Sequence, residues 1–219
     1  MNFDGNAVDF RIGVYDAADR LEIGAGTTMG TTPGITMASS GGTGLPANKN
    51  YHLGSDGAAV PGPGITGGTG TQCKSWVIRN GDIVHTQILI DLTGLASTAD
   101  GDIIGTGSAD ASIGTLMVAV NNTIFAGRMT CMEAPTTGEP DIDLYFASVS
   151  TGEHDDAVSG ISGQARALDT AADWTVGTVK MIPQSSLPSG TKFLYLVASG
   201  GGTAGVYDHG MLLIEFWGA

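Results

Sequence analysis

The sequence has few basic residues, few cysteines and no long apolar run, and each shortage excludes a class of protein. Only 9 Lys and Arg stand against 22 Asp and Glu in 219 residues, a formal net charge of −13. Such a chain repels phosphate backbones and anionic lipid headgroups, so we expect neither nucleic acid nor a membrane as a partner. No segment reaches the roughly 18 apolar residues of a membrane span. The start (MNFDG) lacks a signal region, so we expect the chain to act without export by its own signal.

Cysteine is nearly absent, with Cys73 and Cys131 far apart in the sequence. Each lies in a predicted strand with no second cysteine nearby. A disulfide between them is open, but we favour two buried thiols, because free cysteine commonly behaves as a small core residue.

Glycine is abundant instead, at 35 residues, against a usual share of about 7%. Each glycine inside a helix costs roughly 1 kcal/mol relative to alanine, so this composition favours short strands and turns. The glycines follow no three-residue period, which excludes collagen.

Composition divides the chain at residue 72. Residues 1–71 are rich in Gly, Thr, Ser and Pro; residues 7–15 predict one strand and residues 21–23 a short one. From residue 24 to residue 71 there is too little apolar surface for a core, so we expect an extended arm or loop that is flexible or ordered by a partner. Residues 72–219 predict the folded body.

A β-hairpin is the strongest local prediction of the body. Asn80-Gly81 suits a type I′ turn between residues 76–79 and 82–92, where Ile88, Ile90 and Leu92 share one face. A second hairpin is predicted around Asn121-Asn122, a weak helix at residues 158–172, and further strands at 142–149, 175–182, 193–198 and 211–217. Regularly spaced strands of this kind predict an all-β antiparallel sandwich, with a jelly roll as the first choice.

No catalytic constellation emerges from the motifs. The sequence has no G-x-S-x-G elbow and no Gly-Lys dipeptide for a phosphate loop. Its four histidines, His52, His85, His154 and His209, lack metal-pair spacing, and His85 is expected on the polar face of a strand. We therefore predict no catalytic residue, no cofactor and no metal site.

Two acidic groups need a closer look. Asp141 and Asp143 alternate after a turn and are expected on one face of a strand, where Ca²⁺ could bind them; the alternative, which we favour, is a solvated strand edge. For the loop cluster His154-Asp155-Asp156 the same two interpretations stay open, an ion site or solvated side chains.

Tryptophan gives the chain a possible sugar platform, through Trp76, Trp174 and Trp217. Because each lies in or beside an apolar strand, we favour core packing. A hydrolase with dispersed carboxylates stays a rival interpretation, since the 22 acidic residues offer many pairs.

Several blocks resemble a family of tailed-phage virion proteins of marine and freshwater phages. They are WVIRNGDIVHTQILIDLTGL with DIIG, IFAGRMTCMEAP with GEPDIDLY, and LYLV with LIEFWG, within residues 72–219 but not in the arm.

The resemblance implies a jelly-roll capsid decoration (cement) protein, without enzymatic activity, that is made in the host cytoplasm and carried on the capsid exterior. Its implied partners are the major capsid protein and further copies of itself, as a homotrimer, with Phe216 and Trp217 in the body or a subunit interface. A head-spike or tail-associated protein that binds a receptor or carbohydrate is the alternative.

Overall fold

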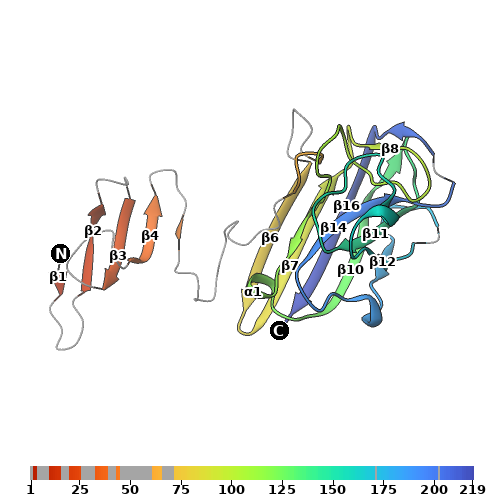
Figure 1. The fold of residues 1–219 in the computed structure, drawn as a ribbon. Coiled ribbons are helices and arrows are strands. Elements are labelled where there is room, and N and C mark those ends of the chain that lie inside the picture. Colours follow the sequence, from red (N-terminus) through yellow and green to blue (C-terminus); the bar gives the residue numbers. More distant parts are fainter. Residues whose placement is uncertain are drawn as a thin grey trace. The chain divides into compact units, whose positions relative to one another are not determined.

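A computed structural model describes residues 2–3, 10–15, 20–25, 33–38, 43–44, 61–65, 72–170, 172–201 and 203–219 (Figure 1). The chain divides into two compact units, Met1–Gly54 with Ile78–Gly81, and Ser55–Val77 with Asp82–Ala219. In the described part, no helix is long and apolar enough to span a membrane.

The N-terminal strands form an antiparallel sheet in sequence order: β1 Asn2–Phe3, β2 Phe10–Tyr15, β3 Arg20–Ala25, β4 Pro33–Ala38 and β5 Thr43–Gly44. Strands β2 and β3 were expected, but β4 corrects the expectation of an extended chain after residue 24. In β4, Ile35 and Met37 lie opposite Ile23 and Leu21 of β3. Two apolar residues among glycine and threonine are too weak a signal to predict a strand. The division of the chain at residue 72 stays a prediction.

The body, residues 72–219, contains a five-stranded antiparallel sheet in the order β13-β10-β16-β7-β6. Its long strands alternate buried and more exposed positions, as one face of a sheet packed on a core requires. Its strands are β6 Cys73–Asn80, β7 Ile83–Asp91, β10 Ile124–Thr136, β13 Val179–Met181 and β16 His209–Gly218.

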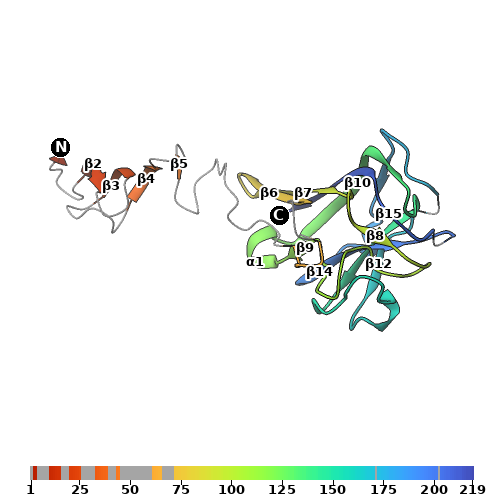
Figure 2. The ribbon, with the colours of Figure 1, turned by 90° about the horizontal axis from the view of Figure 1, so that it is seen from above.

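A second sheet has the order β12-β11-β14-β9 and forms the other layer of the body (Figure 2). Five of the seven residues of β14 are buried, so this strand is covered on both faces, as its continuous apolar run predicts. The elements are β9 Gly114–Leu116, β11 Ile142–Ala147, β12 Ala165–Leu168 and β14 Lys192–Ala198, with β8 Ala96–Ser97 paired to β15 Gly205–Val206, the helix α1 Val118–Asn121, and the 3-10 turns η2 Val158–Gly160 and η3 Gln184–Ser186.

The pairing of the strands identifies a jelly roll. Strand β7 pairs with β16, β9 with β14, β10 with β13, and β11 with β12, always antiparallel. The first of these eight strands therefore pairs with the last, the second with the seventh, and so on inward. A long hairpin of four strands on each side, rolled into two sheets, has this pattern. The predicted all-β sandwich is confirmed, in its jelly-roll form.

The core lies between the two sheets. It contains side chains of both layers, including Ile88 and Phe216 from one and Leu144 and Leu196 from the other. The rings of Phe146 and Phe216 are 6.0 Å apart. Cys73 and Cys131 are free and buried, which confirms the thiol interpretation.

Three local predictions need correction. The first hairpin exists, but its turn residues are Gly81 and Asp82; Gly81 has φ +62° and Asn80 has no positive φ, which fits a type II′ turn with glycine first. The second hairpin is wrong, because β9 and β10 lie in different sheets and α1 joins them. The helix at residues 158–172 is wrong apart from η2, since its later part forms β12.

Candidate interaction surface on the five-stranded sheet

The side of the five-stranded sheet that faces away from the core is the best candidate site, and its residues follow from the strand register. Three cross-strand rows of β13, β10, β16 and β7 lie two residues apart along each strand, so they share one face, and a fourth row follows across a bulge in β10. We call this set the outer face: Val179, Thr130, Leu213 and Leu89; Met181, Arg128, Glu215 and Gln87; Ala126, Trp217 and His85; and Glu133, Met211 and Asp91.

A buried carboxylate organises the centre of the outer face. The Glu215 side chain is 3% exposed. Its Oε2 accepts a hydrogen bond from Arg128 Nε at 2.5 Å. Its Oε1 accepts one from Gln87 Nε2 at 3.2 Å and lies 3.0 Å from His85 Nε2. All three partners come from the strands that flank β16. Because each carboxylate oxygen already has a partner within the sheet, neither oxygen is left free for a ligand.

The surroundings of Glu215 lower its pKa. Burial alone raises that pKa, but hydrogen bonds from Arg128 and Gln87 and the charges of Arg128 and His85 more than offset burial. The Glu215 carboxylate and the Arg128 guanidinium are therefore both charged at neutral pH, and their two charges cancel within the outer face.

Trp217 is held between two neighbours. The imidazole of His85 stacks on its ring at 4.7 Å and 11°, and the guanidinium carbon of Arg128 lies 5.4 Å from the ring centroid. Since His85 is on β7 and Arg128 on β10, they approach the indole from the two strands beside β16. The indole of Trp217 is therefore already in contact with side chains of its own sheet.

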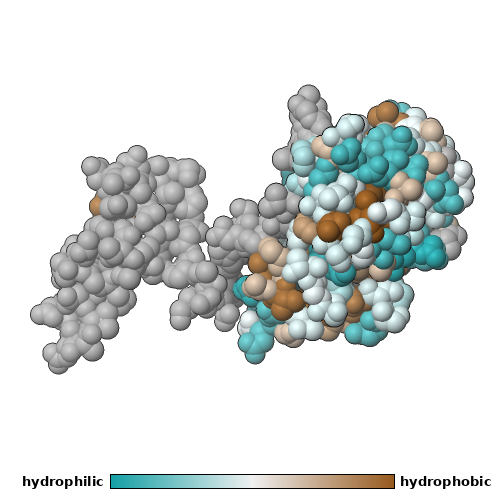
Figure 3. All heavy atoms as spheres, in the orientation of Figure 1, coloured by the Kyte–Doolittle hydropathy of each residue, from teal (hydrophilic) through white to brown (hydrophobic). Residues whose placement is uncertain are grey.

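Exposed apolar side chains continue the outer face towards its β13 edge. Val179 is 49% exposed and Met181 60% exposed. Val176 and Met132 are exposed close by, since Gly177 and Cys131 are joined by a backbone hydrogen bond. On the side of the body seen in Figure 3, in contrast, hydrophobic residues lie in small separate patches.

The paired acids occupy a different place from the one expected. Asp141 and Asp143 do lie together, because the hydroxyl of Thr170 is within hydrogen-bond reach of both carboxylates. They are not a solvated edge, however, since both are buried, Asp143 to 2% exposure. The main-chain N–H of Thr170 donates to Asp143 Oδ1 at 2.8 Å, and Glu139 accepts the N–H of Asp141 at 3.1 Å. The carboxylates of Asp141, Asp143 and Glu139 therefore all accept hydrogen bonds from within the protein.

Burial raises the pKa of Asp141; Thr170 and Lys180 oppose the shift, and the charges of Asp143 and Glu139 add to it. Among the residues that the structure describes, no three or more His, Cys, Asp or Glu side chains are placed to hold a metal ion. The carboxylates of this group therefore have the geometry of a structural network.

The histidines are dispersed, and His52 lies outside the described residues. His85 is on the outer face, as expected for the polar side of a strand. His209 is exposed at the start of β16. His154 is half-buried, its Nε2 without a hydrogen-bond partner, next to the exposed Asp155 and Asp156.

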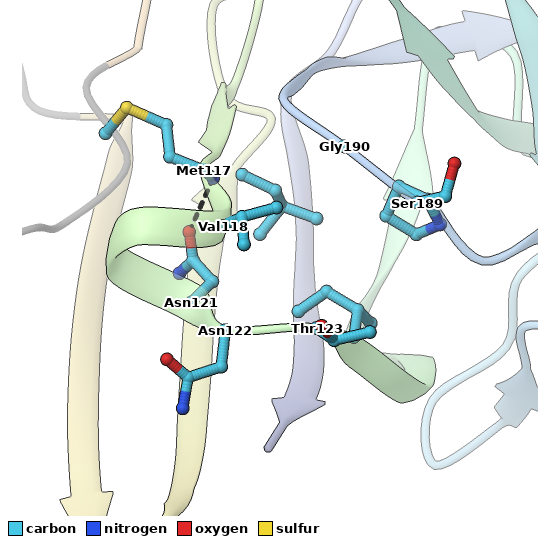
Figure 4. A pocket seen from close by; sticks show the side chains of 10 residues that line it. Met117, Val118, Asn121, Asn122, Thr123, Ser189 and Gly190 are labelled. Carbon is cyan, nitrogen blue, oxygen red and sulfur yellow. Dashed lines mark hydrogen bonds between the residues drawn. The ribbon is translucent and has the colours of Figure 1, made fainter.

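A shallow hollow lies between α1 and the segment before β14 (Figure 4). Its volume is about 10 Å³, far below the roughly 300–1,000 Å³ of typical small-molecule sites. Asn121 closes one side, where its Oδ1 accepts the N–H of Met117 at 2.7 Å. The hollow therefore offers no substrate-sized pocket.

Sequence reasoning missed most of the outer face. The packing prediction for tryptophan is right for Trp174, which is 1% exposed, and wrong for Trp76, which is 40% exposed on β6. Phe216 is buried in the body core, and Trp217 lies half-buried on the outer face. The alternation of Thr86, Gln87 and Ile88 indicates that Gln87 points away from the core. Only the register of the strands shows which residues of the neighbouring strands lie beside Gln87.

Comparisons with known proteins add little. No family model matches the chain, and none of the curated proteins matches it. Among solved structures, the chain is similar to the capsid of Ralstonia phage GP4, with a TM-score of 0.35 and 21% identity, over 64% of this chain and 85% of that one. A likeness of this degree carries no argument about function.

Proposed function

We propose that this chain is a non-enzymatic virion structural protein, a decoration protein that binds the outer surface of a phage capsid and stabilises the expanded head. The observation that carries the proposal is the outer face, a broad surface with exposed apolar side chains and a self-neutralised charge pair. The sequence blocks that resemble phage virion proteins support it, and viral capsid domains are among the proteins that use jelly rolls.

The chemistry of the body favours binding over catalysis. Glu215 is saturated by Arg128, Gln87 and His85, and the buried acids near Thr170 bond internally. A general acid or base needs access to a substrate proton, which these groups do not have. We therefore infer that the protein acts through the surfaces it buries.

The proposed mechanism is stabilisation by mass action. A protein that binds only the expanded shell lowers the free energy of that shell and opposes its rupture. Copies joined as a homotrimer would add their contacts to the major capsid protein through effective concentration. In this proposal, the N-terminal segment, residues 1–71, lies across neighbouring capsid subunits except where Gly62 and Gly64 bond to the body and Ile65 is buried in its core. The virion exterior is the site of action.

Co-sedimentation tests the proposal. Purified protein is mixed with emptied, expanded capsids and with unexpanded shells, and both are pelleted. We expect saturable binding to expanded capsids only, and a higher temperature of capsid disruption in calorimetry. If the protein stays in the supernatant with both shells, the proposal is wrong.

Carbohydrate binding is the second candidate, because Trp76 is 40% exposed on the same sheet and jelly rolls also occur in lectins. Its test is a glycan array with the native chain and Trp76→Ala. Binding that Trp76→Ala abolishes supports this candidate; a blank array with the native chain contradicts it.

A further inference from the structure

The N-terminal sheet has two faces of different chemistry, and the strand register defines both. Successive residues of a strand alternate between the faces. The three charged residues of β1 to β5, Arg11, Arg20 and Glu22, all belong to one face. The rows of the other face contain no charged residue, and we call them the apolar face: Phe3, Phe10 and Ala25; Ile12, Ile23 and Ile35; and Val14, Leu21, Met37 and Thr43.

The apolar face has no second layer among the described strands of its unit. The strands β1 to β5 all lie in one sheet. On the apolar face, Val14 is 68% exposed and Leu21 36% exposed. A sheet with one apolar face must bury that face against another layer, so this sheet needs a cover from outside β1 to β5.

The edges of the sheet are poorly suited to association. Its edge strands, β1 and β5, have two residues each, and very short edge strands protect a sheet from edge-to-edge pairing. A partner therefore reaches this sheet through a face, and the apolar face offers the greater hydrophobic gain.

Charge indicates which surface covers the apolar face. The outer face of the body carries the exposed Glu133, and an uncharged sheet laid over it would bury that carboxylate without a cation. The apolar face of a second copy has no charge to desolvate. The chain has a net charge of −13, but residues 1–54 contain five Asp and Glu against three Lys and Arg. Two N-terminal units can therefore meet with little repulsion.

We propose that the apolar face packs against the apolar face of a second copy, so that copies of this chain associate through their N-terminal sheets. Two sheets of the same twist pack face to face as in a β-sandwich, and three around an axis enclose the same surface, as a homotrimer would. This inference goes beyond the proposed function and does not depend on capsid binding.

Light scattering after size exclusion, over a wide concentration range, tests the contact on the full chain. The native protein is compared with Val14→Asp and Leu21→Asp. The control is Tyr15→Asp, at the next residue of β2 and on the opposite face. We expect the native protein and the control to be multimeric. The dissociation constant should rise at least about tenfold in both test variants, because association would bury a carboxylate without a cation.

A crosslink tests the same contact without adding a charge, so the test stands even where an acidic variant does not fold. Ile23 belongs to the middle row of β3, the central strand, and Glu22 is the neighbouring residue on the opposite face. Ile23→Cys and Glu22→Cys are treated with a short bismaleimide, with the native chain as the blank, since Cys73 and Cys131 are buried. Packed sheets lie about 10 Å apart, so Ile23→Cys should form a covalent multimer much faster than Glu22→Cys.

The outcomes separate this inference from the proposed function. A native protein that is monomeric throughout, unchanged affinity in both acidic variants, or equal crosslinking at residues 22 and 23 would overturn the inference. Acidic variants that stay multimeric but no longer pellet with expanded capsids would assign the apolar face to the capsid, which also overturns it. Failure of the native multimer to pellet would contradict the proposed function and leave the contact between copies intact.

Discussion

At the residue scale, two buried carboxylates respond oppositely to the same kind of environment. Glu215 and Asp141 are both nearly inaccessible to solvent, which alone raises a carboxyl pKa. Glu215 faces a guanidinium and its pKa falls, whereas Asp141 lies with Asp143 and Glu139 and its pKa rises. The sequence indicated that Asp141 and Asp143 share a face, but burial depends on Thr170, 27 residues from Asp143, which no local pattern reveals.

Glu215→Gln should destabilise the protein at pH 7 by about 1–2 kcal/mol. The variant amide places a donor against Arg128 or against Gln87. Because the folded pKa of Glu215 is lowered, its contribution is present above the unfolded pKa and is lost as the pH falls through the folded pKa. Urea unfolding of both proteins from neutral to acid pH should therefore show a difference that disappears on acidification.

Asp141→Asn should have the opposite effect on stability at pH 7 from Glu215→Gln. The folded pKa of Asp141 is raised, so the native state holds the proton more tightly and stability falls as the pH rises through that pKa. Removing the charge should raise the free energy of unfolding at pH 7 by about 1 kcal/mol, with no gain in acid. The same urea series measures it; a loss of stability at pH 7 would show that the carboxylate binds something more than Thr170.

The thiols of Cys73 and Cys131 should be unreactive in the native state. Burial raises the pKa of Cys73 to about 12 and also raises that of Cys131, and a thiol reacts as thiolate. We expect slow labelling by a thiol reagent in buffer, fast labelling of two groups in denaturant, and no effect of reductant on the thermal midpoint. Fast labelling of native protein would contradict the packing described for both residues.

At the element scale, the strands were easier to predict than the connections. Alternation beside the Asn80-Gly81 pair located β6 and β7, and near-continuous apolar runs located β14 and β16, because each strand presents one apolar face or two to the core. The link between β9 and β10 was mistaken for a hairpin turn, since Asn121-Asn122 is a good turn pair. Asn121 instead makes a contact far away in the sequence, because its Nδ2 donates a hydrogen bond to Thr86 Oγ1 of β7 at 2.7 Å.

Asn121→Ala should cost about 2–3 kcal/mol, because it leaves the Met117 N–H and the Thr86 hydroxyl without their partner. Asn122→Gly is the matched control. Asn122 has φ +58°, a conformation that glycine adopts without strain, so this change should be neutral or stabilising. Thermal denaturation of both variants measures the difference, and equal losses would contradict the anchoring role of Asn121.

Gly218→Ala should disrupt the end of β16. A Cβ at residue 218 would overlap the carbonyl oxygen of Asn121, which is backbone and cannot move aside cheaply. Gly190→Ala meets nothing within 4 Å and is the control. We expect a loss of more than about 3 kcal/mol in urea unfolding for the first change and little for the second.

At the scale of the whole molecule, nested pairing explains both what was predictable and what was not. Composition and strand spacing were sufficient for an all-β sandwich, and the jelly roll followed as the first choice. The partners within each row of the outer face were beyond reach, since His85 and Glu215 are 130 residues apart. The outer face could therefore be described only from the register.

That nesting also places β16, the last strand of the body to be synthesised, in the interior of its sheet, between β10 and β7. A ribosome-bound chain that still lacks residues 209–218 has two strand edges, on β10 and β7, open to other chains. The body can thus close only after translation has passed its final strand. Partly synthesised or C-terminally clipped copies would present those edges for aggregation and could not display the outer face.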